Sequence, residues 1–225
     1  MTVTAILPVP VRFARRRDAV FAAVAGTSPL DRAVRALEVT GDVVIAVAGP
    51  LADQVREALA GQSFSRVRVV VSEPPGERVH CVAAGLAVVA DTSHVVVHDI
   101  EWPTAGTGVV DRVAAALREG AVAVMPSCPV TDSVKSVDPD GALTATLDRS
   151  QLRTVQYPRG FAADVLAQLV GLHRSGPFDE LEAALSAGVP VSLIDGDAEA
   201  LRVELPRDTD YLAALITTRR DLPTP

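Results

Sequence analysis

The sequence predicts a three-layer α/β/α sandwich built on a mainly parallel β-sheet. Short apolar runs bounded by polar residues recur along the first 130 residues, and such runs are typical of strands that are buried on both faces. Helix-like segments separate these runs, and parallel strands need crossover connections of this kind. The chain has 225 residues, 48% of them hydrophobic, which is enough for a single domain over residues 1–225.

The first half of the chain alternates strand and helix patterns. The apolar runs predict strands at residues 4–7, 42–47, 67–71, 95–97 and 121–126. The segments between them predict helices at residues 28–37, 51–59, 78–89 and 109–117. In the first helix, Pro29 suits the first helical position, and Leu30, Val34 and Leu37 share one face. Gly61 and Gly120 follow the second and fourth helices, where glycine is a favoured C-terminal cap.

The second half of the chain begins with a predicted β-hairpin. Residues 133–137 and 143–147 alternate as strands do, and the sequence Pro139-Asp140-Gly141 between them is a strong turn signal. Few residues here are large and apolar, so we expect this arm, residues 133–157, to project and to pack against a partner subunit. Helices at 162–172, 178–187 and 208–217, a strand at 189–194 and a disordered tail at 221–225 complete the expected order.

Composition and charge exclude several classes of protein. A formal net charge of −7 disfavours general affinity for nucleic acid. No apolar run reaches the roughly 18 residues that would span a bilayer, so no membrane association is expected. Residues 2–11 contain two prolines and lack a basic segment, unlike a signal peptide, so we expect a cytoplasmic protein. Cys81 and Cys128 have neither metal-ligand spacing nor a disulfide framework.

One carboxylate stands at the end of a predicted buried strand. The run Val95-Val96-Val97 is followed by His98 and Asp99. In open α/β sheets, ligands bind beyond the carboxyl ends of the strands, so an aspartate at this point is placed to hold a metal or a charged substrate. A helix N-cap or a turn is the alternative explanation of the same residue.

Five segments in this order resemble the 2-C-methyl-D-erythritol 4-phosphate cytidylyltransferase family. They are residues 76–86, 97–103, 129–135, 147–152 and 188–196, with the hairpin arm between the third and the fourth. The resemblance implies a Rossmann-like nucleotidyltransferase fold with a projecting β-hairpin dimerisation arm. It also implies a homodimer clasped by that arm, and Mg2+-dependent transfer of CMP from CTP to a sugar-alcohol phosphate with release of pyrophosphate.

The resemblance also implies roles for individual residues. It assigns catalysis to Arg15, Asp99 and Arg202, and nucleotide binding to Arg15, Arg78 and Cys81. It assigns substrate binding to Asp99, Trp102, Ser133 and Arg149, and Mg2+ binding to Asp99. In this scheme Arg149 reaches the phosphate that the neighbouring subunit binds, and Arg202 stands where the family has a lysine.

Several positions depart from the family pattern. The family's phosphate loop, Ala-Ala-Gly-x-Gly-x-Arg, corresponds to residues 9–15, where both glycines are missing and Pro10 lacks an N–H donor. Cys81 replaces a serine, and Trp102 replaces an arginine. Two hypotheses follow. The chain is either a divergent cytidylyltransferase for 2-C-methyl-D-erythritol 4-phosphate or a related polyol phosphate, or a catalytically impaired paralogue that acts as a binding or regulatory protein.

Overall fold

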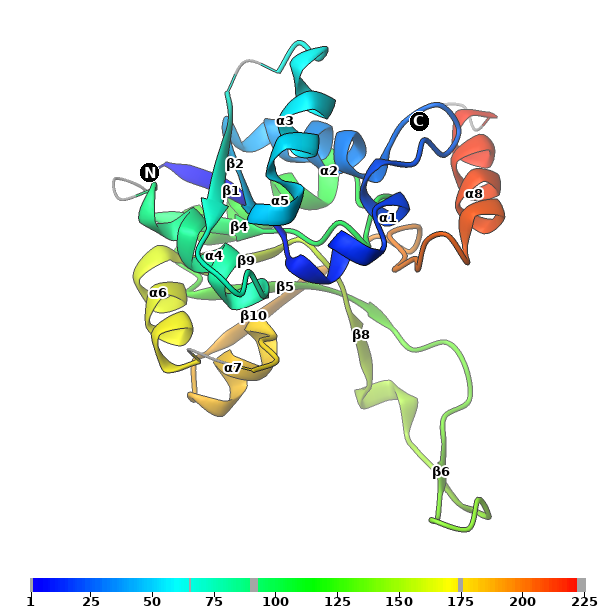
Figure 1. The fold of residues 1–225 in the computed structure, drawn as a ribbon. Coiled ribbons are helices and arrows are strands. Elements are labelled where there is room, and N and C mark those ends of the chain that lie inside the picture. The colour runs from blue at the N-terminus through cyan, green and yellow to red at the C-terminus, as the bar shows by residue number, and fades with distance from the viewer. Residues whose placement is uncertain (1, 65, 90–92, 174–175, 222–225) are drawn as a thin grey trace.

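The computed structural model describes residues 2–64, 66–89, 93–173 and 176–221, and it contains one large sheet with helices on both faces (Figure 1). The strands are β1 (Val3–Val9), β2 (Asp42–Ala48), β3 (Val67–Ser72), β4 (His94–Val97), β5 (Ala123–Pro129), β6 (Lys135–Val137), β7 (Leu143–Thr146), β8 (Arg153–Val155), β9 (Arg159–Ala162) and β10 (Val191–Asp195). The α-helices are α1 (Asp18–Phe21), α2 (Pro29–Leu37), α3 (Ala52–Ala60), α4 (Arg78–Ala87), α5 (Thr107–Arg118), α6 (Ala163–Leu172), α7 (Glu180–Ser186) and α8 (Thr209–Asp221). Short 3-10 helices are η1 (Val11–Arg15), η2 (Glu38–Thr40), η3 (Gly49–Leu51) and η4 (Arg149–Gln151).

The strands of the large sheet follow the order β10-β5-β9-β4-β1-β2-β3, and β8 pairs with β5 beside this path. The β1–β2, β1–β4, β2–β3 and β5–β10 pairs are parallel. β9 lies antiparallel between β4 and β5, and β8 is also antiparallel. The predicted Rossmann-like α/β fold with a mainly parallel sheet is therefore confirmed.

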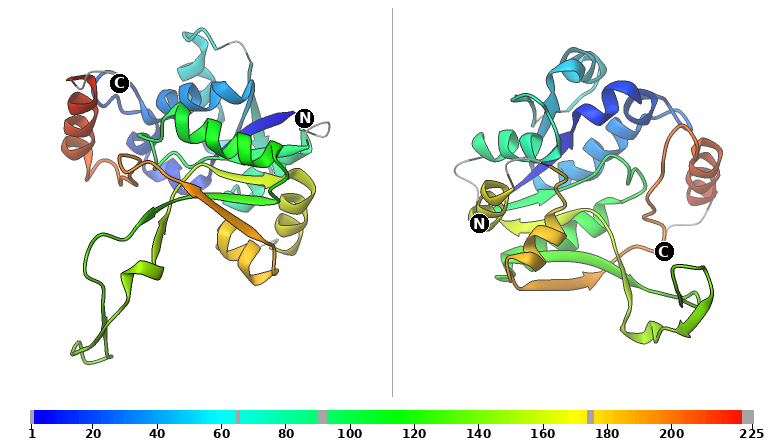
Figure 2. Two further views of the ribbon diagram at one scale, coloured as in Figure 1. Left: turned by 180° about the vertical axis from the view of Figure 1, so that it is seen from behind. Right: turned by 60° about the horizontal axis from the view of Figure 1, so that its bottom comes forward.

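Alternate residues of each central strand face different helix layers, because successive side chains of a strand point to opposite faces. Ala5 and Leu7 of β1 contribute to the core beneath α2, α3 and α5, together with Leu212 of α8. Ile6 contributes to the opposite core, beneath α4, α6 and α7. Figure 2 shows these two helix layers from behind and from below.

The predicted elements of the first half are present, with shifted ends. Ser28 caps α2 by accepting a hydrogen bond from the backbone N–H of Asp31 at 3.1 Å, and Gly120 follows α5 with a φ of 102°. The strand predicted at 121–126 runs instead from Ala123 to Pro129, because it continues far enough to pair with β8. The strand predicted at 189–194 begins two residues later, at Val191.

The two antiparallel strands β8 and β9 are not predicted from the sequence. They have three and four residues, and β9 begins with the polar Arg159 followed by Gly160, so neither forms an apolar run. Glycine is needed at position 160 because a Cβ there would stand 2.6 Å from Cγ1 of Val113 in α5. Close packing of α5 on β9 therefore explains a residue that disfavours strands in general.

The predicted hairpin is present as β6 and β7, and it extends away from the body of the molecule (Figures 1 and 2). Its turn is held by Asp138, whose Oδ1 accepts hydrogen bonds from the N–H groups of Asp140 and Ala142 at 3.1 and 2.8 Å. Val137 and Leu143 on the arm are 59% and 72% exposed. Contact of the arm with a second subunit stays a prediction.

No helix within the described residues is long and apolar enough to cross a membrane. The tail at residues 221–225 is expected from the sequence to be disordered. Residues 222–225 of it lie outside the described residues.

Candidate active site

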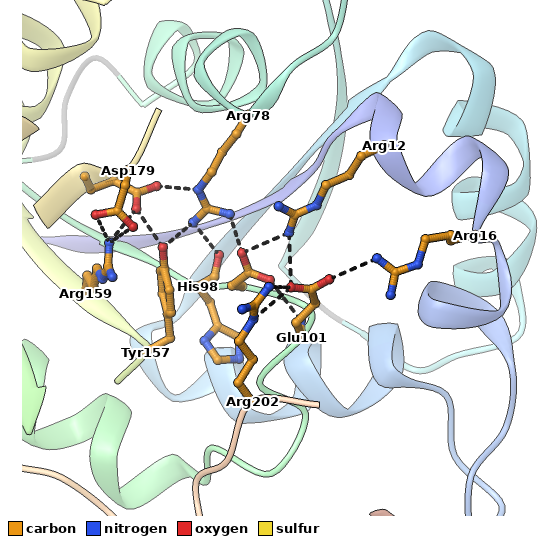
Figure 3. Close-up of polar contacts among 11 residues, drawn as sticks. Arg12, Arg16, Arg78, His98, Glu101, Tyr157, Arg159, Asp179 and Arg202 are labelled. Atoms are coloured by element: carbon orange, nitrogen blue, oxygen red, sulfur yellow. Dashed lines mark hydrogen bonds and ion pairs between the residues drawn. The ribbon is translucent and has the colours of Figure 1, made fainter. Parts of the chain in front are cut away.

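The candidate site lies where the carboxyl ends of the central strands meet. Asp99 lies two residues beyond the end of β4, and Arg12 lies in η1, just after β1. Arg159 begins β9 and is paired in register with Val97 at the end of β4. The loop after β10 brings Arg202 to the same edge. Figure 3 shows the side chains of Arg12, Arg159 and Arg202 converging from segments far apart in the sequence.

Asp99 is a buried and charged carboxylate. Its Oδ2 accepts hydrogen bonds from Arg78 at 2.7 Å and from Arg12 at 3.4 Å, and its Oδ1 accepts one from the backbone N–H of Glu101 at 2.9 Å. Burial raises the pKa of Asp99, but these arginines and the N–H group outweigh burial and hold the pKa below its ordinary value. The position of Asp99 beyond a buried strand is as the sequence predicts.

Arg78 is fixed by a second acidic residue, Glu180, which is fully buried at the start of α7. Arg78 Nε donates to Glu180 Oε1 at 2.7 Å, and its Nη2 donates to the hydroxyl of Tyr157 at 3.1 Å. The Tyr157 hydroxyl donates in turn to Glu180 Oε2 at 2.8 Å. Arg159 donates to the same oxygen at 3.1 Å and to both oxygens of Asp179 at 2.9 Å. Glu180 thus holds two buried guanidinium groups.

A second buried carboxylate, which is not among the predicted site residues, belongs to Glu101, which is 5% exposed. Its Oε2 accepts hydrogen bonds from Nη2 and Nε of Arg202 at 2.8 and 3.1 Å. Arg12 and Arg16 each approach the same carboxylate to 3.6 Å. The signal that could have identified Glu101 is its place two residues after the aspartate that follows the buried strand.

His98, between β4 and Asp99, is fully buried behind the site. Burial lowers the pKa of His98 to about 4. The charge of Asp99 acts to raise this pKa, and the charge of Arg78 acts to lower it further. Its ring meets that of Tyr157 edge to face, with 6.5 Å between the centroids. His98 is therefore neutral at pH 7 and packs behind the charged groups.

Two adjoining pockets open at this edge. The first, of about 280 Å³, is lined by Arg12, Arg78, Asp99, Glu101, Trp102, Tyr157, Arg159, Phe178, Asp179 and Arg202. The second, of about 370 Å³, is lined by Pro10, Val11, Arg12, Glu77, Arg78, Gly176, Pro177 and Phe178. Arg12, Arg78 and Phe178 belong to both linings, so a ligand in either pocket lies beside the same two guanidinium groups.

The loop after β1 does not have the glycine-rich form of a phosphate-wrapping loop, as its sequence predicts. Its residues form η1, and Phe13 is fully buried. The backbone N–H of Val11 donates to the Gly76 carbonyl at 2.8 Å, and that of Phe13 donates to the Pro10 carbonyl at 3.1 Å. These two backbone donors are therefore already used within the fold.

The structure brings together four of the predicted site residues: Arg78, Asp99, Trp102 and Arg202 all line the smaller pocket. The Trp102 ring lies 6.0 Å from that of Tyr157. Arg202 pairs with Glu101, and a direct Asp99–Arg202 ion pair is not among the contacts of the described residues.

The other predicted residues lie elsewhere. Arg15 is exposed, and its side chain makes no hydrogen bond or ion pair within the described part of the chain. Cys81 is fully buried, with its sulfur 3.6 Å from the Ser72 hydroxyl. Ser133 and Arg149 are exposed on the arm, where Arg149 donates to the Thr131 carbonyl.

The residues present fit a divalent cation only in combination with a ligand. Within the described ranges, no three His, Cys, Asp or Glu side chains form a metal-binding group. Asp99 and Glu101 both line the smaller pocket, and Mg2+ is commonly held by one or two carboxylates together with substrate phosphates. The donor set therefore suits Mg2+ bound with a phosphate ester.

Residues 6–219 match the family model described as 2-C-methyl-D-erythritol 4-phosphate cytidylyltransferase. A protein of that name from Saccharopolyspora erythraea is 37% identical over 223 residues, which cover 96% of this chain and all of that one. One from Rhodococcus jostii is 35% identical over 209 residues, covering 92% of this chain and 90% of the relative. Among solved structures, the enzyme of the same name from Thermus thermophilus has a TM-score of 0.75 at 25% identity, covering 96% of this chain and all of that one. A synthase from Anaerococcus prevotii reaches 0.79 at 18% identity, covering 96% of each chain, which supports the fold alone.

Proposed function

The chain belongs to the 2-C-methyl-D-erythritol 4-phosphate cytidylyltransferase family, and we propose that it transfers CMP from CTP to 2-C-methyl-D-erythritol 4-phosphate in the isoprenoid pathway. The observation that carries the proposal is the family match over residues 6–219, combined with a charged pocket at the carboxyl edge of the sheet. The alternative of an impaired paralogue is not favoured, because relatives that match nearly the whole chain bear the enzyme's name.

The proposed reaction is an in-line displacement at the α-phosphorus of CTP. A phosphate oxygen of the acceptor forms a bond to this phosphorus, while the bond to the α–β bridging oxygen breaks and its electrons leave with pyrophosphate. Such reactions depend mainly on positioning and on neutralising negative charge. We assign the nucleotide to the larger pocket beside η1 and the acceptor to the smaller one, so that Arg12 and Arg78 lie between the reactants.

Mg2+ is proposed as the divalent cation, with Asp99 as its ligand from the protein. When bound, it would neutralise charge on the phosphate oxygens. Arg78 keeps Asp99 ionised and oriented, and Arg78 is itself held by Glu180, so the carboxylate is fixed before a ligand arrives. Arg202 offers a guanidinium that suits a phosphate, since arginine forks bind phosphate through two parallel hydrogen bonds.

Trp102 is proposed to narrow the acceptor pocket. Its indole lies against Tyr157, where an arginine would offer a charged fork, so one side of the pocket is apolar. Because of this difference, a related polyol phosphate is a second candidate acceptor. A cytoplasmic location, expected from the sequence, also stays a prediction.

The proposed activity is tested by incubating the protein with CTP, Mg2+ and 2-C-methyl-D-erythritol 4-phosphate. Release of pyrophosphate and formation of the cytidine diphosphate ester are expected, and both should depend on the polyol phosphate. Replacing CTP by ATP or omitting the acceptor gives the controls. A folded protein that yields no ester from this acceptor or from other polyol phosphates would contradict the assignment.

A homodimer clasped by the arm is part of the proposal. The arm bears exposed apolar side chains and carries the exposed Ser133 and Arg149. In the proposed dimer these two residues extend to the substrate of the second subunit. Replacing residues 138–143 by a two-residue turn should weaken the dimer, because it removes the tip that packs on the partner. Sedimentation velocity measures the effect, with Asp140→Asn as a control that keeps the length of the arm. A wild-type protein that is monomeric at micromolar concentration would refute the clasp.

A further inference from the structure

Three arginines of the candidate site converge on Glu101. Arg202 donates two hydrogen bonds to one of its oxygens, at 2.8 and 3.1 Å, and Arg12 and Arg16 lie at 3.6 Å (Figure 3). The Glu101 side chain is 5% exposed, whereas those of Arg12, Arg16 and Arg202 are 44%, 33% and 67% exposed. One buried carboxylate is thus surrounded by cations that solvent and ligands can reach.

The Glu101 carboxylate lies among the arginine N–H donors that a ligand phosphate would also bind. Arginine forks recognise carboxylate and phosphate oxygens by the same geometry, so Glu101 and a phosphate compete for the same N–H donors. Glu101 also lines the 280 Å³ pocket together with Arg12 and Arg202. Because η1 has already used the backbone donors of Val11 and Phe13, a phosphate beside η1 would depend on arginine side chains such as these.

Arg12 and Arg16 each have a second side-chain anchor that does not involve the Glu101 carboxylate, and the backbone beside Arg202 is held independently of that carboxylate. Arg12 is 3.4 Å from Asp99, and Arg16 donates to the Leu205 carbonyl at 3.1 Å. The segment of Arg202 is held by the neighbouring Val203, whose N–H donates to the backbone carbonyl of Glu101 at 2.8 Å. Neutralising the Glu101 side chain therefore frees guanidinium donors, while the side chains of Arg12 and Arg16 and the backbone at Arg202 keep their other contacts.

We propose that Glu101 is a specificity-determining residue, an internal anion that phosphate-bearing ligands must displace from Arg12, Arg16 and Arg202. This inference rests on the proposed function and assigns a role to a residue for which the family resemblance implied none. Because a phosphate must displace the Glu101 carboxylate before it binds the arginines, Glu101 lowers the affinity for every phosphate-bearing ligand. The affinity for uncharged ligands is unaffected, because they do not compete for the arginines.

The test is calorimetric binding of inorganic triphosphate in the presence of EDTA, which removes any contribution from a divalent cation. Glu101→Gln keeps the size of the side chain and one acceptor oxygen, and it removes the charge. We expect it to bind triphosphate about tenfold more tightly than the wild type, the effect of freeing a charge-assisted contact. Glu101→Ala removes the same charge together with most of the side chain, and it should also bind triphosphate more tightly than the wild type.

Glu204→Gln is the matched control. Glu204 also pairs with Arg16, at 3.4 Å, but its side chain is 54% exposed, so its loss should change the affinity less than about threefold. Cytidine, which carries no phosphate, should bind the wild type and Glu101→Gln equally.

Equal or weaker triphosphate binding by both Glu101 variants would overturn the proposal and make Glu101 a positioning residue for the arginines. An equal gain for cytidine would overturn it too, since the effect would then be one of space. A failure of this inference can be told apart from a failure of the proposed function, because the calorimetry measures anion binding without cation or acceptor, whereas the activity assay measures formation of the ester.

Discussion

Asp99→Asn should lower kcat/KM for CMP transfer by about 10²–10³-fold, the effect of removing one preorganised electrostatic group from a transition state. Asparagine keeps the shape of the side chain but removes the charge that Arg78 and Arg12 hold in place. The cation expected at this site also loses its ligand from the protein. Because Arg78 keeps its 2.7 Å ion pair with Glu180, the loss should appear mainly in activity.

Initial rates of pyrophosphate release over a range of CTP and Mg2+ concentrations measure this effect. Raising Mg2+ should recover part of the rate if the substitution weakens cation binding. Asp140→Asn, an exposed change of the same kind at the arm's turn, should leave the rate unchanged. Activity of Asp99→Asn within about threefold of the wild type would remove Asp99 from the reaction.

Glu180→Gln should destabilise the protein by about 3 kcal/mol, near the lower end of the values for breaking a buried ion pair. Glu180 is fully buried and accepts from Arg78, Arg159 and Tyr157, so its neutralisation leaves two buried guanidinium groups short of a counter-ion. The loss stays near that lower end because Arg78 keeps Asp99 and Arg159 keeps Asp179. For a domain of this size the fall in Tm would be about 6–12 °C.

Urea and thermal unfolding measure this loss. Glu182→Gln lies on the same helix and is exposed, so it provides the matched control and should change stability by less than about 0.5 kcal/mol. If the two variants unfolded at the same urea concentration, the ion pairs of Glu180 would contribute nothing net to the fold.

The local part of the fold could be predicted from the sequence, because apolar runs and helical spacing act within ten residues or so. β1 to β4 and α2 to α5 follow from such patterns. β8 and β9 do not, since they are short and polar and are strands only because β4 and β5 pair with them.

The candidate site is predictable only where a residue stands at a recognisable point of the chain. Asp99 follows a buried strand, and Arg78 begins a helix. Glu180 lies 102 residues from Arg78, and a glutamate in the first turn of a helix is ordinarily expected to face solvent. The ion pairs of Glu101 are not predictable for a related reason, because its partners Arg12 and Arg202 come from distant segments that meet only in the folded chain.

The place of β9 in the sheet has a consequence for the order in which the chain folds. In the described part of the structure, β4 and β5 are joined in the sheet through β9, which follows both of them in sequence. During synthesis, β1 to β4 can pair as soon as they emerge, but β5 cannot join them until residues 159–162 have left the ribosome. Arg159 and Tyr157 arrive with that same segment, and pairings between distant segments form slowly. We therefore expect the ligand-binding edge to be among the last parts of the nascent protein to assemble.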